Sequence, residues 1–548
     1  MSAVEVTAVG AAADAIATQV GALVEERFAS RLFAQDPTLW GPDAVSEASK
    51  RLSWVGLPSS SRPLVAEIRA LRDEVISRGL TRVVLCGMGG SSLAPEVICA
   101  TAGVPLLALD SSDPDVVREA FVDLANTVAV ISSKSGSTVE TDSQRRAFEQ
   151  AFRDAGLDPT LHMVVVTDPG SPLDAEARAG GFRVVNADPN VGGRYSALTA
   201  FGLVPSGLAG VDIEQLLDDA ESVADLLASD DDANPGLRLG AAMGGTQPLR
   251  DKFFLVDAGT QIVGFGDWAE QLIAESTGKL GKGILPVVVP PPGPVDPPQD
   301  VTVCHLVDEH DDPSATGASL VQVAGPLGAQ MLLWEVAVSV AGRLIGINPF
   351  DQPDVESAKA AARTLLDGGA EGSTPPAFVH GGIEVRALGG PGAEGTDGGW
   401  LGSADTLDEA VAALLGQLDE DHGYVAIMAY LDRSTDVRLA DATPVVAARV
   451  HRPVTFGWGP RFLHSTGQYH KGGPPTGVYI QVSATPEEDL AVPGRDFTFG
   501  QFIAAQAGGD AAVLAEHGRP VLRLHLPDDD ASLDRVIAAL TGPEEPTA

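Results

Sequence analysis

Continuous apolar runs alternate with helical segments through much of the chain, and this alternation constrains the fold more than any other feature. Four such runs follow one another: TRVVLCG (81–87), VPLLALD (104–110), TVAVISS (127–133) and LHMVVVTD (161–168). Helical segments alternate with them near 93–101, 114–124, 138–155 and 172–180. Strands without polar alternation are buried on both faces, and strands joined through helices run parallel. The pattern therefore predicts an α/β fold with a doubly wound, mostly parallel sheet.

A second round of the same alternation follows a helical stretch at 213–227. Its expected strands lie near 252–258, 284–290 and 302–307. Its expected helices lie near 328–345 and 355–366. The tail holds further expected strands at 424–431, 477–482 and 519–526, with helices near 406–417, 499–516 and 531–540. These three strands are too few and too widely spaced to predict a separate sheet.

The predicted division of the chain has four parts. Residues 1–79 show the apolar spacing of helices and are expected to form an N-terminal helical cover. Residues 80–212 and 213–370 are expected to form the first and second α/β domains. The C-terminal part, 371–548, is expected to complete the second domain. A chain of 548 residues is long enough for two or more domains.

Charge and composition exclude some classes of function. The formal net charge of −39 argues against nucleic-acid binding, because phosphates demand a basic surface. The chain has no apolar run long enough to predict a membrane span, and its first residues lack the basic region of a signal peptide. Cys86, Cys99 and Cys304 lack metal-ligand spacing. These features fit a reducing cytoplasm.

Two polar turns follow buried strands and begin helices. GMGGSS (87–92) can turn tightly and offer helix N–H groups to an anion, although it lacks the third glycine of a dinucleotide-binding turn. SSKSGST (132–138) is rich in hydroxyls and lacks the P-loop pattern of nucleotide-binding proteins. Because open α/β sheets bind ligands at the carboxyl ends of their strands, these turns predict a phosphate-binding site. A serine-rich N-cap turn is the alternative for the second.

The segment QLIAESTGKLGKG (271–283) holds the best candidate for a general base. Glu275 lies at the end of a helical run, and small residues follow it directly. Gln271 lies one turn earlier on the same helix face, and small residues allow a ligand to approach the backbone. A carboxylate in this place suits proton abstraction in a cleft. The alternative is a surface glutamate before a helix C-cap glycine.

Two further segments carry basic residues that have no decisive meaning alone. NVGGRYS (190–196) places Arg194 after two glycines, and INPFDQ (347–352) leads into a helix that carries Lys359. A solvated loop arginine and an exposed helix lysine are the alternatives.

Taken together, these segments resemble one family. GMGGSS, SSKSGST, VGGRYS, QLIAESTGK and NPFDQPDVESAK occur in the order found in glucose-6-phosphate isomerases, across residues 85–360. The resemblance implies two flavodoxin-like sugar-isomerase domains with the active site between them. It also implies interconversion of glucose 6-phosphate and fructose 6-phosphate through a cis-enediolate, without metal or nucleotide cofactor, by a homodimer.

The resemblance also implies a role for each matched residue. Glu275 would move the proton between C1 and C2, and Arg194 would stabilise the charge of the enediolate. Three residues would line the sugar site: Gln271, Gln352 and Lys359, the last near the ring oxygen. The phosphate would be held by Ser91, Ser133, Ser135 and Thr138, with the backbone of Gly89, Gly90 and Lys134.

The histidine that opens the sugar ring is displaced in this chain. The family has it soon after the glutamate, in a stretch like QHSxxQ, which His305 and His310 do not match. His464 has the required spacing to Gln468 and is the predicted ring-opening residue, with His470 as a rival. A loop or N-cap histidine is the alternative for both. The displacement also indicates that the tail contributes to the site.

Two other functions are open to the same scaffold. One is an isomerase that also accepts mannose 6-phosphate or a phosphoheptose, and the other is a non-catalytic sugar-phosphate sensor. The joint presence of Glu275, Arg194 and Lys359 speaks against the sensor, because a sensor needs only the phosphate-binding turns.

Overall fold

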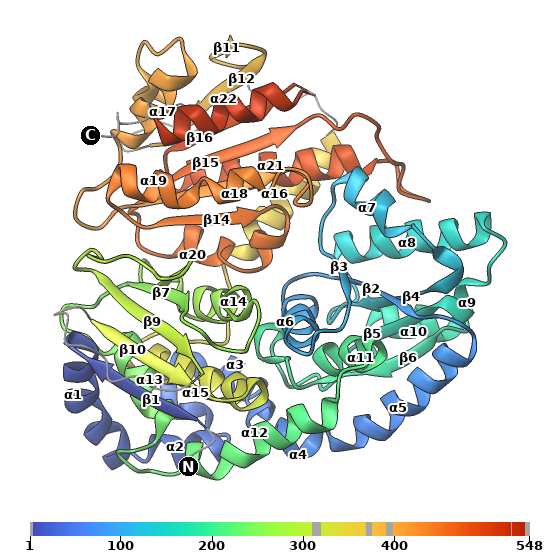
Figure 1. Ribbon diagram of the computed structural model, residues 1–548, viewed down its shortest axis with the longest axis vertical. Coiled ribbons are helices and arrows are strands. Elements are labelled where there is room, and N and C mark those ends of the chain that lie inside the picture. The colour runs from blue at the N-terminus through green and yellow to red at the C-terminus, as the bar shows by residue number, and fades with distance from the viewer. Residues whose placement is uncertain (1–3, 309–318, 369–374, 391–397, 528, 543–548) are drawn as a thin grey trace. The chain divides into compact units, whose positions relative to one another are not determined.

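The computed structural model describes residues 4–308, 319–368, 375–390, 398–527 and 529–542 (Figure 1). The chain forms two compact units. The first comprises Met1–Asp110, Ala120–Thr277 and Gly283–Asp351, and the second comprises Ser111–Glu119, Gly278–Lys282 and Gln352–Ala548. The chain therefore passes from one unit to the other five times, after residues 110, 119, 277, 282 and 351.

The first unit contains two sheets. One has the order β3-β2-β4-β5-β6, with every neighbouring pair parallel. Its strands are β2 (Arg82–Gly87), β3 (Leu107–Leu109), β4 (Thr127–Ser132), β5 (Met163–Thr167) and β6 (Arg183–Asn186). The strand order reverses between β2 and β4, so the carboxyl ends of these two strands flank the place where such sheets bind ligands.

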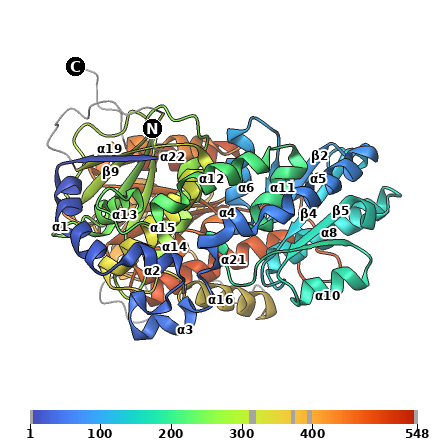
Figure 2. The same cartoon turned by 90° about the horizontal axis from the view of Figure 1, so that it is seen from below.

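Helices cover both faces of this first sheet. They are α5 (Arg62–Ser77), α6 (Leu93–Thr101), α8 (Val139–Asp154), α9 (Pro159–His162), α10 (Pro172–Ala179) and α11 (Ala200–Ala209). Helices α5 and α11 pack side by side, as Figure 2 shows. The strands β2 and β4 are almost wholly buried, which explains why their sequences carry no polar alternation.

The second sheet of this unit has the order β1-β10-β9-β7-β8. Its strands are β1 (Glu5–Val9), β7 (Lys252–Asp257), β8 (Leu285–Val289), β9 (Val301–Val307) and β10 (Leu320–Ala324). All pairs are parallel except that β1 runs antiparallel to β10. The N-terminal part was expected to be helical, so β1 is a difference from that prediction. Its five residues, EVTAV, add an edge strand through backbone pairing, which helical spacing does not reveal.

The helices of this half include one, α15, that is both long and apolar. The helices are α1 (Ala11–Glu25), α2 (Phe28–Phe33), α12 (Ile213–Leu227), α13 (Pro235–Gly244), α14 (Phe265–Thr277) and α15 (Leu327–Ile345). By length and composition α15 could cross a membrane, but 83% of its apolar window is buried inside the protein. It packs against α12, α13 and α14, so it serves as a core helix.

The second unit has a six-stranded sheet and a hydrophobic core of its own. Its strands are β11 (Phe378–His380), β12 (Ile383–Leu388), β13 (Tyr424–Tyr430), β14 (Val454–Trp458), β15 (Gly477–Ala484) and β16 (Val521–Leu526). Strands β14, β13, β15 and β16 are parallel in that order, and β12 and β11 extend the β16 edge antiparallel. Its helices are α16 (Val355–Gly368), α17 (Leu407–Leu415), α18 (Arg438–Asp441), α19 (Thr443–Val450), α20 (Gly467–Gly472), α21 (Phe499–Glu516) and α22 (Asp530–Thr541).

This arrangement differs from the expected division of the chain. Residues 371–548 were expected to complete the second domain, but the strands found there pair with one another. The expected tail strands became β13, β15 and β16, and the short strands β12 and β14 join them into one sheet.

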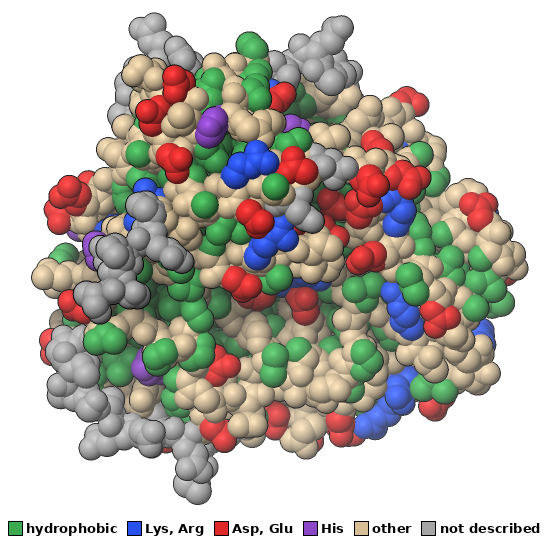
Figure 3. Space-filling view, turned by 45° about the horizontal axis from the view of Figure 1, so that its top comes forward, with side chains coloured by type: hydrophobic (Ala, Val, Ile, Leu, Met, Phe, Trp, Pro, Cys, Tyr) green, Lys and Arg blue, Asp and Glu red, His purple; other side chains and the backbone are tan. Residues whose placement is uncertain are grey.

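Acidic side chains outnumber basic ones on the face shown in Figure 3, in agreement with the net charge of −39.

Candidate active site

The two polar turns of the first sheet lie at its strand-order reversal. GMGGSS follows β2 and SSKSGST follows β4, and these two strands pair directly. A Cβ on Gly87 would lie 3.0 Å from the carbonyl oxygen of Ser132 and 3.0 Å from Cβ of Ser91, so the turns are in contact. The structure thus brings the predicted phosphate-binding segments together at one sheet edge.

The second turn presents hydroxyls at the start of α8. Thr138 is the N-cap residue of this helix, and its hydroxyl accepts a hydrogen bond from Ser133 at 3.2 Å instead of capping the helix. Ser135 pairs with the Ser137 hydroxyl at 2.9 Å and is exposed, whereas Ser133 is buried. Hydroxyl groups beside a helix N-terminus suit an anion.

The Lys134 side chain is directed elsewhere. Its ammonium group contacts the Asp168 carboxylate at 2.6 Å and the carbonyl oxygen of Pro189 at 3.4 Å. Burial lowers the pKa of Lys134, and Asp168 opposes that change. The side chain is therefore committed to a protein carboxylate, which fits the prediction that Lys134 offers its backbone N–H group to a ligand.

Glu275 lies buried near the end of α14, one turn after Gln271. The Gln271 amide donates to the Glu275 carboxylate at 3.4 Å, and the Arg194 Nη1 atom lies 3.6 Å from the same oxygen. All three side chains are buried, with 3%, 5% and 3% of the surface of Gln271, Glu275 and Arg194 exposed. The structure thus groups three predicted site residues around one carboxylate. The alternative of a surface glutamate does not apply.

Protein acceptors fix the Arg194 guanidinium group. Its Nε atom donates to the Ser276 hydroxyl at 2.8 Å, and Nη2 donates to the carbonyl oxygens of Pro349 and Asp351 at 2.7 and 3.1 Å. The Tyr195 hydroxyl lies 3.3 Å from the same Ser276 hydroxyl. These contacts leave the Nη1 edge of Arg194 turned toward Glu275. A charge held in this way needs no reorganisation when negative charge develops beside it.

The phosphate-type turns and the Glu275 cluster are neighbours within the first unit. A Cβ on Gly90 would lie 1.9 Å from the carbonyl oxygen of Gly193, the residue before Arg194. Only glycine therefore fits at position 90, and it brings the GMGGSS turn against the VGGRYS turn. Glu275, Arg194 and the hydroxyl-rich turns share one region of the fold.

The other predicted site residues belong to the second unit. Gln352 is exposed just before α16, and Lys359 lies within α16, although its side chain is outside the part that the structure describes. His464 ends a short 3-10 helix, Arg461–His464, and is partly exposed. Its rival, His470, lies on α20 and is buried.

His470 sits in an aromatic cluster. Its Nδ1 atom is 3.1 Å from the Tyr424 hydroxyl, which lies 2.6 Å from the Tyr479 hydroxyl. The His470 and Tyr424 rings are near parallel, with an interplanar angle of 21°. Burial lowers the pKa of His470 to about 3, and the positive charges of Lys471 and Arg519 contribute to that shift. His470 is therefore neutral near physiological pH.

Sequence reasoning missed two contacts of the predicted site residues and their neighbours. Ser276 bonds Arg194, and Gln468 bonds the segment that follows α14. Ser276 directly follows Glu275, but a hydroxyl next to a carboxylate does not by itself indicate an arginine partner. The spacing of Gln468 to His464 is visible in the sequence, but its hydrogen bonds are visible only in the structure.

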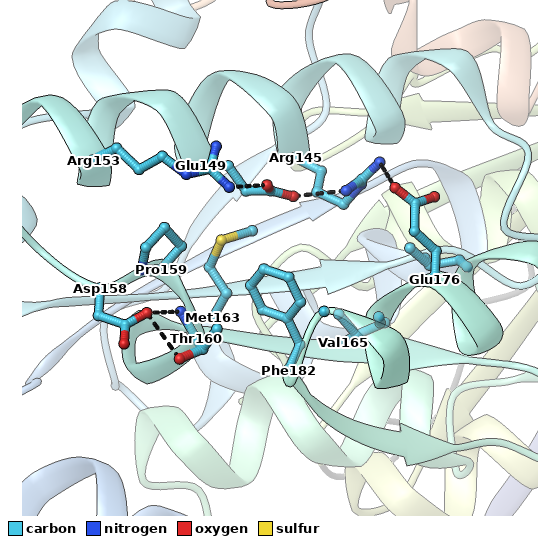
Figure 4. Close-up of a pocket in the computed structure, with 13 residues that line it drawn as sticks. Arg145, Glu149, Arg153, Asp158, Pro159, Thr160, Met163, Val165, Glu176 and Phe182 are labelled. Atoms are coloured by element: carbon cyan, nitrogen blue, oxygen red, sulfur yellow. Dashed lines mark hydrogen bonds and ion pairs between the residues drawn. The ribbon is translucent and has the colours of Figure 1, made fainter.

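A separate pocket of about 320 Å³ lies on the first sheet (Figure 4). It is bounded by α8, α9, α10 and strand β5, and none of the predicted site residues line it. Its Arg145 donates to Asp142, Glu149 and Glu176, so the charged wall is already paired. We place the chemistry at the Glu275 cluster.

Comparison with known proteins shows the family to which the chain belongs. No protein-family model matches the chain. A probable glucose-6-phosphate isomerase of Haloarcula marismortui is 30% identical over 355 residues, which cover 53% of this chain and 79% of that protein. The chain belongs to the glucose-6-phosphate isomerase family.

Further relatives of this isomerase-family chain agree. A probable glucose-6-phosphate isomerase of Natronomonas pharaonis is 29% identical over 385 residues, which cover 60% of this chain and 90% of that protein. The crystal structure of a hypothetical protein from Thermus thermophilus is similar with a TM-score of 0.55 and 26% identity, covering 65% of this chain and 97% of that one. The predicted sugar-isomerase-type α/β fold is confirmed.

Proposed function

We propose that the chain is an aldose–ketose isomerase that interconverts glucose 6-phosphate and fructose 6-phosphate, with Glu275 as the base. Membership of the glucose-6-phosphate isomerase family supports this activity. The observation that carries the proposal for Glu275 is its buried carboxylate, held by Gln271 and faced by the Arg194 guanidinium at 3.6 Å.

The reaction moves one proton between two neighbouring carbons. Glu275 takes the proton from the carbon next to the carbonyl, and the electron pair of that C–H bond forms the double bond of a cis-enediolate. The carbonyl oxygen gains negative charge, which the fixed Arg194 stabilises. Glu275 then returns the proton to the carbon that carried the carbonyl. The remaining hydroxyl proton passes from the neighbouring oxygen to the charged oxygen, and the carbonyl forms at the carbon that lost its proton. A positioned base of this kind contributes about 10²–10⁴-fold to the rate.

The phosphate group binds at the turns of the first sheet. Its ligands are the hydroxyls of Ser91, Ser133, Ser135 and Thr138 and the backbone of Gly89, Gly90 and Lys134. Contact between Gly90 and Gly193 supports this arrangement, because it sets the phosphate turns beside Arg194. We assign Gln352 and Lys359 to the sugar-binding residues as well, Lys359 near the ring oxygen.

His464 opens the sugar ring in this proposal. Its partial exposure leaves it accessible to a ligand, whereas His470 is 2% exposed and bonded to Tyr424. Histidine can deliver a proton to the ring oxygen and accept one from the C1 hydroxyl near neutral pH. We expect His464→Ala to slow turnover of the cyclic substrate strongly and to spare proton exchange on an acyclic analogue. An unchanged His464→Ala beside a slow His470→Ala would transfer the role to His470.

The decisive experiment is Glu275→Gln. The amide has the same shape but cannot accept the carbon-bound proton, so substrate binding should persist while turnover is nearly lost. Isomerisation in both directions and deuterium uptake from solvent at C2 measure this. Turnover within tenfold of the wild type would contradict the role of Glu275.

The same assays separate the other candidate functions. Isomerisation of mannose 6-phosphate at a comparable rate would identify the broader isomerase. Binding of fructose 6-phosphate without any turnover would identify a sensor.

We also propose a cytoplasmic homodimer. The three cysteines are free and buried, which suits a reducing compartment. Light scattering during size-exclusion chromatography measures the mass of the particle. A mass near 56.5 kDa, that of a single chain, would contradict the dimer.

A further inference from the structure

The segment that follows the base helix belongs to the second unit. Glu275 is the third-last residue of α14, and from Gly278 to Lys282 the chain packs with the tail. Lys279 and Lys282 exchange two backbone hydrogen bonds, at 3.1 and 3.0 Å. Leu280 and Gly281 between them have φ values of 59° and 70°, as in a type I′ turn. Leucine adopts this conformation only when its surroundings impose it.

One buried side chain holds this segment. The Gln468 amide group on α20 donates to the carbonyl oxygen of Gly278 at 2.8 Å and to the Asp354 carboxylate at 2.6 Å. Its carbonyl oxygen accepts the backbone N–H of Asp354 at 3.0 Å. Gln468 is fully buried; its bond to Gly278 is buried, and its two bonds to Asp354 are part-buried.

The backbone packs tightly around Gln468. The Gly281 N–H group donates to the carbonyl oxygen of Gly472 at 2.8 Å. A Cβ on Gly472 would lie 2.3 Å from the Asp354 carboxylate, 2.7 Å from the carbonyl oxygen of Gly278 and 2.9 Å from the Gln468 amide nitrogen. The three segments that meet here therefore have one arrangement available to them.

We propose that Gln468 is a positioning residue of the isomerase. It joins the chain leaving the base helix, the chain entering the helix of Lys359, and the helix that carries His470. Gly278 is three residues after Glu275, and Asp354 is five residues before Lys359. The inference rests on the proposed function, since positioning matters to a reaction that uses Glu275 and Lys359.

The amide is the group that this place requires. It must donate to two acceptors and accept from one N–H group, which a primary amide can do and a carboxylate cannot. A carboxylate would face Asp354 and the carbonyl oxygen of Gly278 without a proton to give. An apolar side chain would remove all three of these bonds, including the buried one to the carbonyl oxygen of Gly278.

The test begins with Gln468→Leu, compared with Gln481→Leu. Gln481 is a second buried glutamine of the same unit, bonded to the carbonyl oxygen of Ala507 and to Arg523, away from the segment after α14. For Gln468→Leu we expect kcat to fall at least tenfold and KM for fructose 6-phosphate to change less than threefold, because the phosphate turns are untouched. For Gln481→Leu we expect lower stability with kcat per folded molecule unchanged.

Gln468→Glu adds a readout that a merely structural role would not move. The introduced carboxyl group can donate only when protonated, and its neighbour Asp354 raises its pKa. The ratio of kcat between the variant and the wild type should therefore rise as pH falls from 8 to 6. Adding Asp354→Asn to Gln468→Glu should recover only part of kcat at pH 8, because the new amide can donate to the introduced carboxylate while the carbonyl oxygen of Gly278 still has no donor at this position.

Hydrogen exchange separates this inference from the proposed function. In Gln468→Leu the amide of Gly281 should exchange faster, whereas amides of the SSKSGST turn should keep their rates. A wild-type kcat in Gln468→Leu, or a kcat ratio for Gln468→Glu that does not vary with pH, would overturn the positioning role. If Glu275→Gln stays active while these effects appear, the assignment of the base fails and the positioning role stands.

Discussion

Acid should destabilise the second unit because His470 is buried as a neutral ring. Its Nδ1 atom contacts the Tyr424 hydroxyl, and Tyr424, Tyr479 and Phe462 pack around the ring. The charged groups that act on it are Lys471 and Arg519, and both oppose protonation. A protonated ring would have no carboxylate partner among the groups that shift its pKa.

The magnitude follows from the shift in pKa. The pKa of His470 falls from its ordinary value of 6.5 to about 3 in the folded protein. The unfolded chain therefore binds more protons between these values, and stability falls as pH is lowered from 6.5. Each pH unit below 6.5 costs about 1.4 kcal/mol, which amounts to roughly 5 kcal/mol by pH 3. Between pH 7.5 and pH 5.5 the expected loss is about 1.4 kcal/mol.

The perturbation is His470→Asn, whose amide oxygen can accept from Tyr424 and does not titrate. Urea unfolding of both proteins at pH 4.5, 5.5, 6.5 and 7.5 gives the free energy of unfolding at each pH. Asparagine is smaller, so the variant should be less stable at pH 7.5, and the two curves should converge as pH falls. Curves that stay parallel between pH 7.5 and 4.5 would refute the burial of a neutral His470.

Three further predictions concern the first unit. Ser133→Ala with Thr138→Ala should raise KM for fructose 6-phosphate far more than it lowers kcat, because a phosphate remote from the reacting carbons contributes mostly uniform binding; a loss confined to kcat would contradict this. Gly90→Ala should remove most activity and lower the melting temperature, since the methyl group would overlap the Gly193 carbonyl, and an unchanged variant would show that the turns are apart. Glu335 is fully buried on α15, neither of its carboxyl oxygens has a hydrogen-bond partner in the described structure, and burial raises its pKa well above the ordinary value. Because the carboxyl group is held neutral, its effect on the free energy of unfolding becomes less favourable as pH rises above 4.5. Glu335→Met should therefore increase the free energy of unfolding more at pH 8 than at pH 4.5. Equal increases at both pH values would contradict a buried neutral carboxyl group.

The α/β fold was predictable because buried parallel strands carry an unmistakable apolar signal. The runs at 81–87, 127–133 and 161–168 became β2, β4 and β5. Short or edge strands were not predictable: β6 has only four residues, RVVN, and β1 pairs only at one edge. The separate sheet of the tail depends on β12 and β14, whose sequences IEVRAL and VTFGW lack the continuous apolar run of β2, β4 and β5.

The candidate site was predictable to the extent that it is made of local turns. GMGGSS and SSKSGST each follow a strand, so the sheet alone brings them together. The link between Gly90 and Gly193 was not predictable, because it joins turns far apart in the chain. The bonds of Gln468 have the same character: they join residues 278, 354 and 468 through tertiary packing.

The five passages between the two units have a consequence for synthesis on the ribosome. Ser111–Glu119 leaves the exit tunnel early, but the sheet of its unit ends only with β16 at Leu526, 407 residues later. At about 5–20 residues per second, roughly 20–80 s pass between the synthesis of this segment and that of its last packing partner. Gly278–Lys282, which follows Glu275 closely in the chain, is also made before its packing partners. The first unit can collapse before then, but the loop that follows its base would become ordered only after the last part of the chain has been made.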